Sequence, residues 1–438
     1  MNYKLNYNLF YIPLSALIIS SYFLGFYLNE DAAAGGQIDL FDDWSSIHFF
    51  KNSEFLSALT DLRYQSSRMP LYLIINKFNP FTDNIEEFRI SYIFCATSIP
   101  ILFFVFLKKN FKSIDSVTLI FLSSLLMLSP YFRTMSFWAD TEIMAIFFLI
   151  LTLVTFTYLL DLSYENNKKK YYFFAILVAL LSFLSFYSDQ RYIFLSMFIY
   201  FTLILKNDFK FFFIYSLIFT IFALPALYLF YIWGGLVPIF SQSRVTLSLH
   251  GINIFLSSIG LYLLPMFFVL ALEKKIKNLF INLKLFDLIV FLAISIILFF
   301  TLPNSPKFEG AGVIFKFLSL VADKFNANWN LILFVYYIGN LFFLLLILTF
   351  FKKNFKNYIF LIIYSVIFIM VSSTYQQYVD PLFFLLIFCY FNFADQIKIL
   401  NVKYIMTYFL FYLFMLCGAI FYRSVCLTHF LEAACTIK

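Results

Sequence analysis

The chain has 438 residues, of which 63% are hydrophobic and only 13% are charged, and its formal net charge is +7. Soluble globular domains carry about a quarter of their residues as charged side chains, so the composition excludes them and indicates an all-α polytopic membrane protein. Membrane lipids are therefore expected partners, and nucleic acid is not.

Apolar runs long enough to cross a bilayer recur along the chain, separated by short charged segments. We expect about 11 to 13 transmembrane helices in a single domain over residues 1–438, with no separate soluble domain. The expected spans are roughly 9–28, 88–107, 114–129, 143–160, 171–187, 192–205, 211–232, 254–272, 285–302, 331–351, 358–371, 381–393 and 404–421. The segments 192–205 and 381–393 are short enough to be partial spans.

The two kinds of basic residue fall on opposite sides of these spans. Lysines fill short loops such as 108–112, 168–170 and 274–284, which is typical of the cytoplasmic side and predicts a cytoplasmic N-terminus. The arginines fall in or beside the opposite loops and are Arg63, Arg68, Arg89, Arg133, Arg191, Arg244 and Arg423. Guanidinium binds phosphate or carboxylate through a two-pronged fork, so the pattern predicts a phosphate-bearing ligand on the non-cytoplasmic side.

The longest expected outer segment, 29–87, follows the first span. Its apolar pieces at 44–55 and 70–78 are too short to cross the membrane, and we expect them to form amphipathic helices along its surface. The C-terminal segment 422–438 is expected on the same side. There, Cys426 and Cys435 are either a disulfide or two free thiols.

Two adjacent acids, Asp42 and Asp43, lie in this outer segment just before Trp44. Adjacent carboxylates near a membrane repel each other, which favours one of them as a proton acceptor and suits a general base. The pair could instead share a divalent cation with another acid. A third interpretation is structural, because either Asp suits the N-cap of a helix that starts at Trp44.

A second acidic pair, Asp140 and Glu142, opens the apolar run 143–160 a few residues after Arg133. Ionisable groups at the end of a buried helix are costly, which makes them candidates for function. The structural alternative is that Asp140 caps the helix and Glu142 sits in its first turn, where the helix dipole favours negative charge. The spacing alone does not separate these interpretations.

Two further arginines lie at the ends of apolar runs. Arg191 follows Asp189 in a very short turn, and Arg244 lies in a longer outer segment. Each could hold a lipid phosphate. The alternatives are a local ion pair between Arg191 and Asp189, or simple contact of either arginine with lipid headgroups.

Four short motifs occur in a recognisable order over about residues 9–205. They are Asp42-Asp43, then Pro70-Leu71-Tyr72, then Phe88-Arg89-Ile90-Ser91, and then Ser129-Pro130 followed by Arg133 and Glu142. In this order they resemble the GT-C superfamily of integral membrane glycosyltransferases, especially its bacterial protein-mannosyltransferase-like and aminoarabinose-transferase-like members. Asp140-Thr141-Glu142 is also similar to the second-loop acidic pair of oligosaccharyltransferase catalytic subunits.

The chain departs from the family pattern at two places. Arg68-Met69 stand where the family has a His or Lys before Pro-Leu-Tyr. Tyr378 and Pro381 stand in a late Arg-Tyr-x-x-Pro element that lacks its Arg. Both departures concern the donor pocket rather than the acids.

The resemblance implies inverting transfer of a sugar from a polyprenyl-phosphate donor to a hydroxyl of a glycan, lipid or protein at the periplasmic face of a bacterial inner membrane. It implies Asp42 as general base, with Asp43 the second candidate and Asp140 and Glu142 assisting. The implied donor-phosphate ligands are Arg191, Arg133 and Arg244. The implied pocket residues are Arg68, Tyr72 and Tyr378. No cofactor is required, although a divalent cation (Mg²⁺ or Mn²⁺) held by Asp42, Asp43 and Asp140 stays open.

Three rival functions make different predictions. A protein similar to O-antigen polymerases or ligases should carry its largest outer loop in the second half of the chain, whereas here the largest is the first. A flippase or secondary transporter for lipid-linked glycans should carry charges within its spans and a site at interrupted helices. A purely structural membrane subunit leaves the clustering of acids unexplained.

Overall fold

In the computed structural model every element is a helix among the described residues, which confirms the expected all-α class. The described residues are 8–32, 35–61, 70–165, 167–238, 242, 249–273, 276–281, 283–300, 312–350, 363–365, 367, 376–390 and 402–429. The α-helices are α1 Asn8–Tyr27, α2 Gly36–Asn52, α3 Phe55–Thr60, α4 Leu71–Lys77, α5 Ile85–Asn110, α6 Ser116–Ser124, α7 Pro130–Phe137, α8 Thr141–Leu160, α9 Lys168–Ser188, α10 Ile193–Ile204, α11 Phe209–Trp233, α12 Leu249–Tyr262, α13 Leu264–Leu272, α14 Ile276–Ile281, α15 Leu285–Phe300, α16 Val313–Lys324, α17 Trp329–Phe350, α19 Leu382–Tyr390 and α21 Val402–His429. Short 3₁₀ turns are η1 Pro80–Asp83, η2 Leu125–Leu128, η3 Gln190–Tyr192 and η5 Gln376–Tyr378.

The chain is an integral membrane protein. Its described residues contain 8 helices long and apolar enough to cross a bilayer, or up to 9 if the bent pair 116–137 is one span. This number is below the expected 11 to 13 partly because α10 has only 12 residues. Twelve helical residues rise about 18 Å, well short of a hydrocarbon core about 30 Å thick. The expected span 381–393 runs beyond Tyr390 and so lies only partly within the described residues. The expected span 358–371 lies mostly outside the described residues.

The chain divides into two compact units, each assembled from discontinuous segments. Unit 1 comprises Met1–Ala34, Ser113–Arg133 and Thr246–Lys438, and unit 2 comprises Gly35–Lys112 and Thr134–Val245. The boundary falls within α7, so Arg133 belongs to unit 1 and Thr134 to unit 2.

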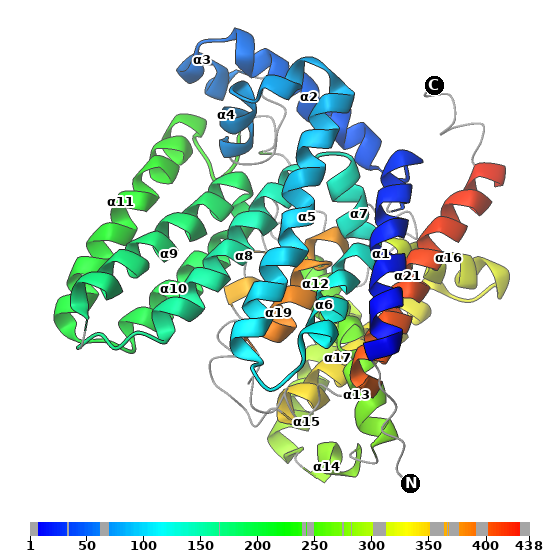
Figure 1. Cartoon of the computed structure of the whole chain (residues 1–438). Coiled ribbons are helices and arrows are strands. Elements are labelled where there is room, and N and C mark those ends of the chain that lie inside the picture. The colour runs from blue at the N-terminus through cyan, green and yellow to red at the C-terminus, as the bar shows by residue number, and fades with distance from the viewer. Residues whose placement is uncertain are drawn as a thin grey trace. The chain divides into compact units, whose positions relative to one another are not determined.

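Unit 2 is a helical bundle in which α8 contacts both α5 and α9, and α9 also contacts α10 and α11 (Figure 1). The hydroxyl of Ser185 on α9 donates a 2.8 Å hydrogen bond to the carbonyl of Ala145 on α8. A small side chain at this position allows the two backbones to approach closely, which is the usual way helices pack in a bilayer.

The segment 29–87, which the sequence predicts to be the first outer segment, contains α2, α3, α4 and η1 at one end of the unit 2 bundle (Figure 1). The carbonyl of Leu59 near the end of α3 accepts a 2.9 Å hydrogen bond from the indole of Trp233 at the end of α11. Trp44 on α2 donates a 3.1 Å hydrogen bond to the carbonyl of Thr82 in η1. These bonds satisfy indole donors and attach the short helices to the bundle.

Helix α2 begins at Gly36, not at Trp44, so the hypothesis that Asp42 or Asp43 caps this helix is wrong. The buried face of α2 includes Leu40, Ile47 and Phe50. Because this apolar face begins before the two acids and continues after them, both acids lie inside the helix rather than at its start. A Cβ added to Gly36 would lie 2.7 Å from a methyl carbon of Thr134 and overlap Trp138 even more closely. The first turn of α2 therefore needs glycine to approach the segment before α8.

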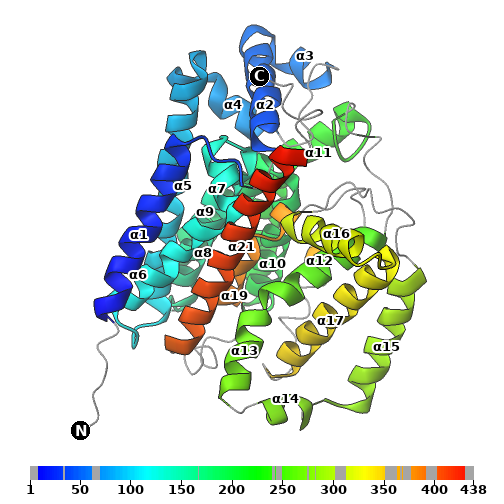
Figure 2. The same cartoon turned by 90° about the vertical axis from the view of Figure 1, so that its right-hand side faces the viewer.

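Unit 1 contains α17 packed against α12, α14 and α15, and α13 packed against α21 (Figure 2). Where α12 crosses α17, a Cβ added to Gly260 would overlap the backbone of Asn340. Glycine at such a crossing lets two helix backbones touch. The chain bends by 70° at Ser129, between the helical segment Ser116–Leu128 and α7.

Candidate functional site

A buried ionic cluster joins the start of α8 to the turn between α9 and α10 in unit 2. The guanidinium of Arg191 forms ion pairs with Glu142 and with Asp189. Its Nε lies 3.0 Å from each oxygen of Asp189. The side chains of Glu142 and Asp189 are 2% and 1% exposed, and that of Arg191 is 13% exposed. We call Asp140, Glu142, Asp189 and Arg191 the acidic cluster.

The local backbone explains why Arg191 turns toward these acids. Asp189 caps η3 by accepting a 3.0 Å hydrogen bond from the backbone N–H of Arg191. The same carboxylate then lies beside the Arg191 side chain, so the local ion pair considered from the sequence is confirmed. The additional bond to Glu142, 49 positions away in the chain, comes from the packing of α8 on α9.

Asp140 is the N-cap of α8 and accepts a 3.1 Å hydrogen bond from the backbone N–H of Glu142. The capping interpretation is therefore confirmed, and Glu142 lies in the first turn, where the helix dipole favours it. Asp140 is nevertheless only 4% exposed. The Thr141 hydroxyl also donates a 3.2 Å hydrogen bond to Asp140. Capping does not exclude catalysis, because a carboxylate offers about four lone-pair sites.

Three contacts hold the segment just before Asp140 in place. The hydroxyl of Tyr72 donates a 2.7 Å hydrogen bond to the carbonyl of Ala139, whose φ of 53° lies in the left-handed region. Arg89 donates from Nε to the carbonyl of Phe137 at 2.8 Å, and its guanidinium lies 4.3 Å from the ring centre of Trp138. A non-glycine residue with positive φ is strained and persists only where surrounding contacts hold it.

Replacing Tyr72 with phenylalanine is expected to lower the free energy of unfolding by about 1–3 kcal/mol, because it leaves the buried carbonyl of Ala139 without this donor. The thermal unfolding midpoint of the purified protein in detergent measures the effect. Tyr231→Phe is the matched control, since Tyr231 is 82% exposed. We call the contacts of Tyr72 and Arg89 with residues 137–139 the Tyr72 clamp. Equal midpoints for the two variants would contradict the stabilising role assigned to this clamp.

The two acids of α2 face different surroundings. Asp42 is exposed, whereas Asp43 is half-buried and lies close enough to Tyr92 to interact with it electrostatically. Successive residues on an α-helix point about 100° apart, which explains the difference. The rings of Tyr92 and Tyr72 are 5.7 Å apart, so Asp43 belongs to the same region as the Tyr72 clamp.

No three Asp, Glu, His or Cys side chains among the described residues form a group that could hold a metal ion. Asp42, Asp43 and Asp140 all lie within that part of the chain and therefore do not form the three-ligand cation site left open by the sequence. Their separation has a simple cause, since Asp140 is turned onto the N-terminus of α8 while Asp42 points to solvent.

The balance of charge in the acidic cluster differs from that of a phosphate site. Among the described residues, the Arg191 guanidinium pairs with two carboxylates, and the third, Asp140, caps the helix that carries Glu142, so the four ionised side chains have a net negative charge. Such a cluster repels phosphate but attracts hydroxyl donors. Arg191 therefore suits the role of holding Glu142 and Asp189 in place better than the predicted role of phosphate ligand.

Arg133 belongs to unit 1, where it forms a two-pronged pair with Glu30. Its Nε and Nη2 lie 2.7 Å and 2.6 Å from the two carboxylate oxygens. Nη2 also donates to the carbonyl of Ser21 at 2.7 Å, and Arg133 is 2% exposed. The fork that was predicted to hold phosphate is thus already paired with a carboxylate that the sequence did not single out.

A second buried acid, Asp380, lies in unit 1 beside the break between α6 and α7. The hydroxyls of Ser129 and Tyr412 lie 2.9 Å and 3.4 Å from its carboxylate oxygens. Burial raises the pKa of Asp380 from its ordinary value to about 7. Nearby, Tyr378 presents its backbone carbonyl to the hydroxyl of Tyr364 at 2.9 Å, which assigns no role to the Tyr378 side chain.

The remaining predicted positions are not placed. Arg68, Arg244 and Cys435 lie outside the described residues, and only the helical backbone is described at Cys426. The acids that the sequence did not single out, Glu30 and Asp380, each sit at the edge of an apolar run, and that position was the only available signal.

The geometry thus brings Asp140, Glu142 and Arg191 together in unit 2, with Asp43 and Tyr72 in the adjoining clamp region. Asp42 lies on the solvent-facing side of α2 instead.

The chain matches no known family model, no curated protein and no solved structure.

Proposed function

We propose that this protein is a membrane glycosyltransferase that moves a sugar from a polyprenyl-phosphate donor to an acceptor hydroxyl at the periplasmic face. In the proposed step a carboxylate takes the hydroxyl proton while the acceptor oxygen attacks the anomeric carbon. The bond from that carbon to the phosphate oxygen breaks with inversion, and its electron pair leaves on the lipid phosphate. The family resemblance of the first 205 residues supports this proposal.

The observation that carries the proposal is the buried acidic cluster at the end of the unit 2 bundle. Three carboxylates no more than 4% exposed are costly beside a membrane, and such groups are functional candidates by default. They lie next to the surface helices of the first outer segment, where an acceptor could approach while the lipid tail of the donor stays in the bilayer.

The residue roles follow from exposure and charge. Asp43 replaces Asp42 as our preferred base, because it is half-buried and faces the Tyr72 clamp region. Asp140 and Glu142 orient the acceptor, with Arg191 holding Glu142. Cations outside the acidic cluster then bind the phosphate of the donor. Our candidates, chosen from their positions in the sequence, are Arg68 and Arg244.

Replacing Asp43 with asparagine is expected to lower turnover by roughly 10²–10⁴-fold, since asparagine cannot accept the proton. The assay reconstitutes the protein in liposomes with a membrane extract as the source of acceptor hydroxyls and with polyprenyl-phosphate hexoses and pentoses radiolabelled in the polyprenyl chain. It measures the labelled polyprenyl phosphate formed. Asp42→Asn is the matched control, because it makes the same change one residue away on the exposed side, and it should retain nearly full turnover.

Loss in Asp42→Asn with normal turnover in Asp43→Asn would reverse the assignment of the base. Undiminished turnover in both variants would remove α2 from the chemistry altogether.

One observation favours a second candidate function, transport of a lipid-linked glycan. The 70° bend at Ser129, with buried Asp380 bonded to it, is the kind of interrupted helix that transporters use for binding. Under this alternative, Asp380→Asn should stop movement of a fluorescent polyprenyl-phosphate sugar across liposomes, whereas Asp43→Asn should not. The glycosyltransferase proposal predicts no such movement in the unsubstituted protein or in either variant.

A further inference from the structure

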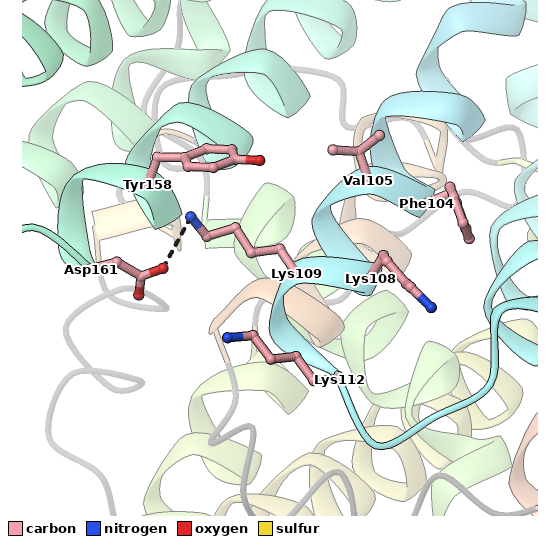
Figure 3. Close-up of a pocket in the computed structure, with 7 residues that line it drawn as sticks. All are labelled: Phe104, Val105, Lys108, Lys109, Lys112, Tyr158 and Asp161. Atoms are coloured by element: carbon pink, nitrogen blue, oxygen red, sulfur yellow. Dashed lines mark ion pairs between the residues drawn. The ribbon is translucent and has the colours of Figure 1, made fainter.

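A pocket of about 410 Å³ opens at the opposite ends of α5 and α8 from the acidic cluster, within unit 2 (Figure 3). We call it the basic pocket, and its lining residues are Phe104, Val105, Lys108, Lys109, Lys112, Tyr158 and Asp161. The residues come from the last turns of two packed spanning helices, so the pocket lies where apolar helix meets polar loop. The lysine distribution predicts that this is the cytoplasmic side.

One lysine of the basic pocket is held rigidly. The ammonium of Lys109 lies 3.0 Å from a carboxylate oxygen of Asp161 and 3.1 Å from the ring centre of Tyr158. Figure 3 shows Lys112 reaching toward the same side as Lys109, whereas Lys108 turns the other way. A lysine fixed by a carboxylate and an aromatic face is already ordered, which lowers the entropic cost of binding an anion.

The charges of the basic pocket do not cancel. Three lysines line it with a single acid, so its net charge is positive. A further cation stands at its edge, because Nζ of Lys206 lies 3.5 Å from the carbonyl of Leu160 in the last turn of α8. The pocket therefore attracts an anion, and ammonium groups bind phosphate as point charges.

Part of the wall of the basic pocket is apolar. Val105 is 36% exposed and Tyr158 is 45% exposed, and both lie on helices that cross the membrane. Phe104, next to Val105 on α5, also lines the pocket. A free anion gains nothing from such a wall, whereas a lipid can lay an acyl chain along it while its phosphate meets the lysines.

We propose that the basic pocket binds the phosphate headgroup of an anionic membrane lipid. Lys109 and Lys112 contact the phosphate, Asp161 orients Lys109, and the first acyl chain follows Val105 toward the membrane interior. The binding site is separate from the glycosyl-transfer proposal and holds whether or not that proposal is correct.

Native mass spectrometry of the full chain in detergent, titrated with phosphatidylglycerol, tests the site. The double variant Lys109→Gln/Lys112→Gln is expected to bind this lipid roughly 25-fold more weakly, about five-fold for each lysine near an anionic surface. Lys112→Glu alone provides a second variant, because Lys112 is exposed and follows the end of α5, so its substitution leaves the fold intact. It is expected to weaken binding by more than five-fold.

The matched control is Lys169→Gln/Lys170→Gln, which removes two exposed lysines at the start of α9 outside the basic pocket. This control should bind within about two-fold of the unsubstituted protein. Equal weakening in both doubles would overturn the proposal, since the effect would then be general charge attraction. Equal binding of phosphatidylcholine would overturn the proposal in favour of nonspecific lipid binding. Displacement of the lipid by millimolar inorganic phosphate would overturn it in favour of a site for free phosphate.

Discussion

Replacing Arg191 with glutamine is expected to destabilise the protein by roughly 3–5 kcal/mol and to abolish sugar transfer. Two carboxylates that are 1–2% exposed would lose their shared cation. Neither could be rehydrated without opening the contact between α8 and the turn after α9. The thermal unfolding midpoint in detergent and the liposome assay measure the two effects.

Two further substitutions separate charge from geometry at this position. Arg191→Lys keeps the charge but offers a point ammonium in place of a fork, so it should recover only part of the stability. Arg89→Gln removes another buried arginine whose partner, Glu86, is 62% exposed, and it should cost less because that acid stays hydrated. If Arg191→Gln and Arg89→Gln lower the unfolding midpoint equally, the pairing of Arg191 with two buried carboxylates does not contribute the extra stability assigned to it.

Replacing Asp380 with asparagine is expected to change the pH dependence of stability. With a pKa of about 7, folded Asp380 stays protonated over a range in which the unfolded acid, with an ordinary value of 3.8, is ionised. The folded state thus binds more protons between about pH 4 and pH 7, so the free energy of unfolding falls as pH rises through this window. The loss attributable to Asp380 reaches roughly 4 kcal/mol above pH 7.

The asparagine variant lacks this titration. Its stability relative to that of the unsubstituted protein should therefore be higher at pH 8 than at pH 5. Unfolding midpoints at the two pH values measure both differences. Tyr412→Phe is the control that keeps the acid and removes one bond to it, so it should keep the pH dependence. An unchanged pH slope in Asp380→Asn would assign the titration to another group.

The placement of the predicted site residues depended on the kind of signal each one offered. Asp140 and Glu142 were found because they open a long apolar run, and they do form the start of α8. Asp42 and Asp43 were equivalent in the sequence, since adjacent positions carry no information about which side faces the protein. Only the packing of α2 distinguishes them, by burying the stripe of Leu40, Ile47 and Phe50.

For the arginines, too, the sequence does not show which side chain each one contacts. Their segregation from lysine is visible in the chain, but the partner of each guanidinium is not. Arg133 pairs with Glu30 at a separation of 103 positions, and Arg191 with Glu142 at 49. Such pairs form because a buried guanidinium must find an acceptor wherever the helices bring one.

The sequence by itself determined the all-α membrane class, the positions of most apolar helices and the acids that open α8. These follow from hydropathy and from capping, which act over a few neighbouring residues. Only the tertiary structure decided that Arg191 bridges two buried carboxylates, that Asp43 rather than Asp42 turns inward, and that lysines of α5 form a pocket with α8. Those outcomes depend on which helix faces meet, and pairing between distant helices is set by packing of the whole unit.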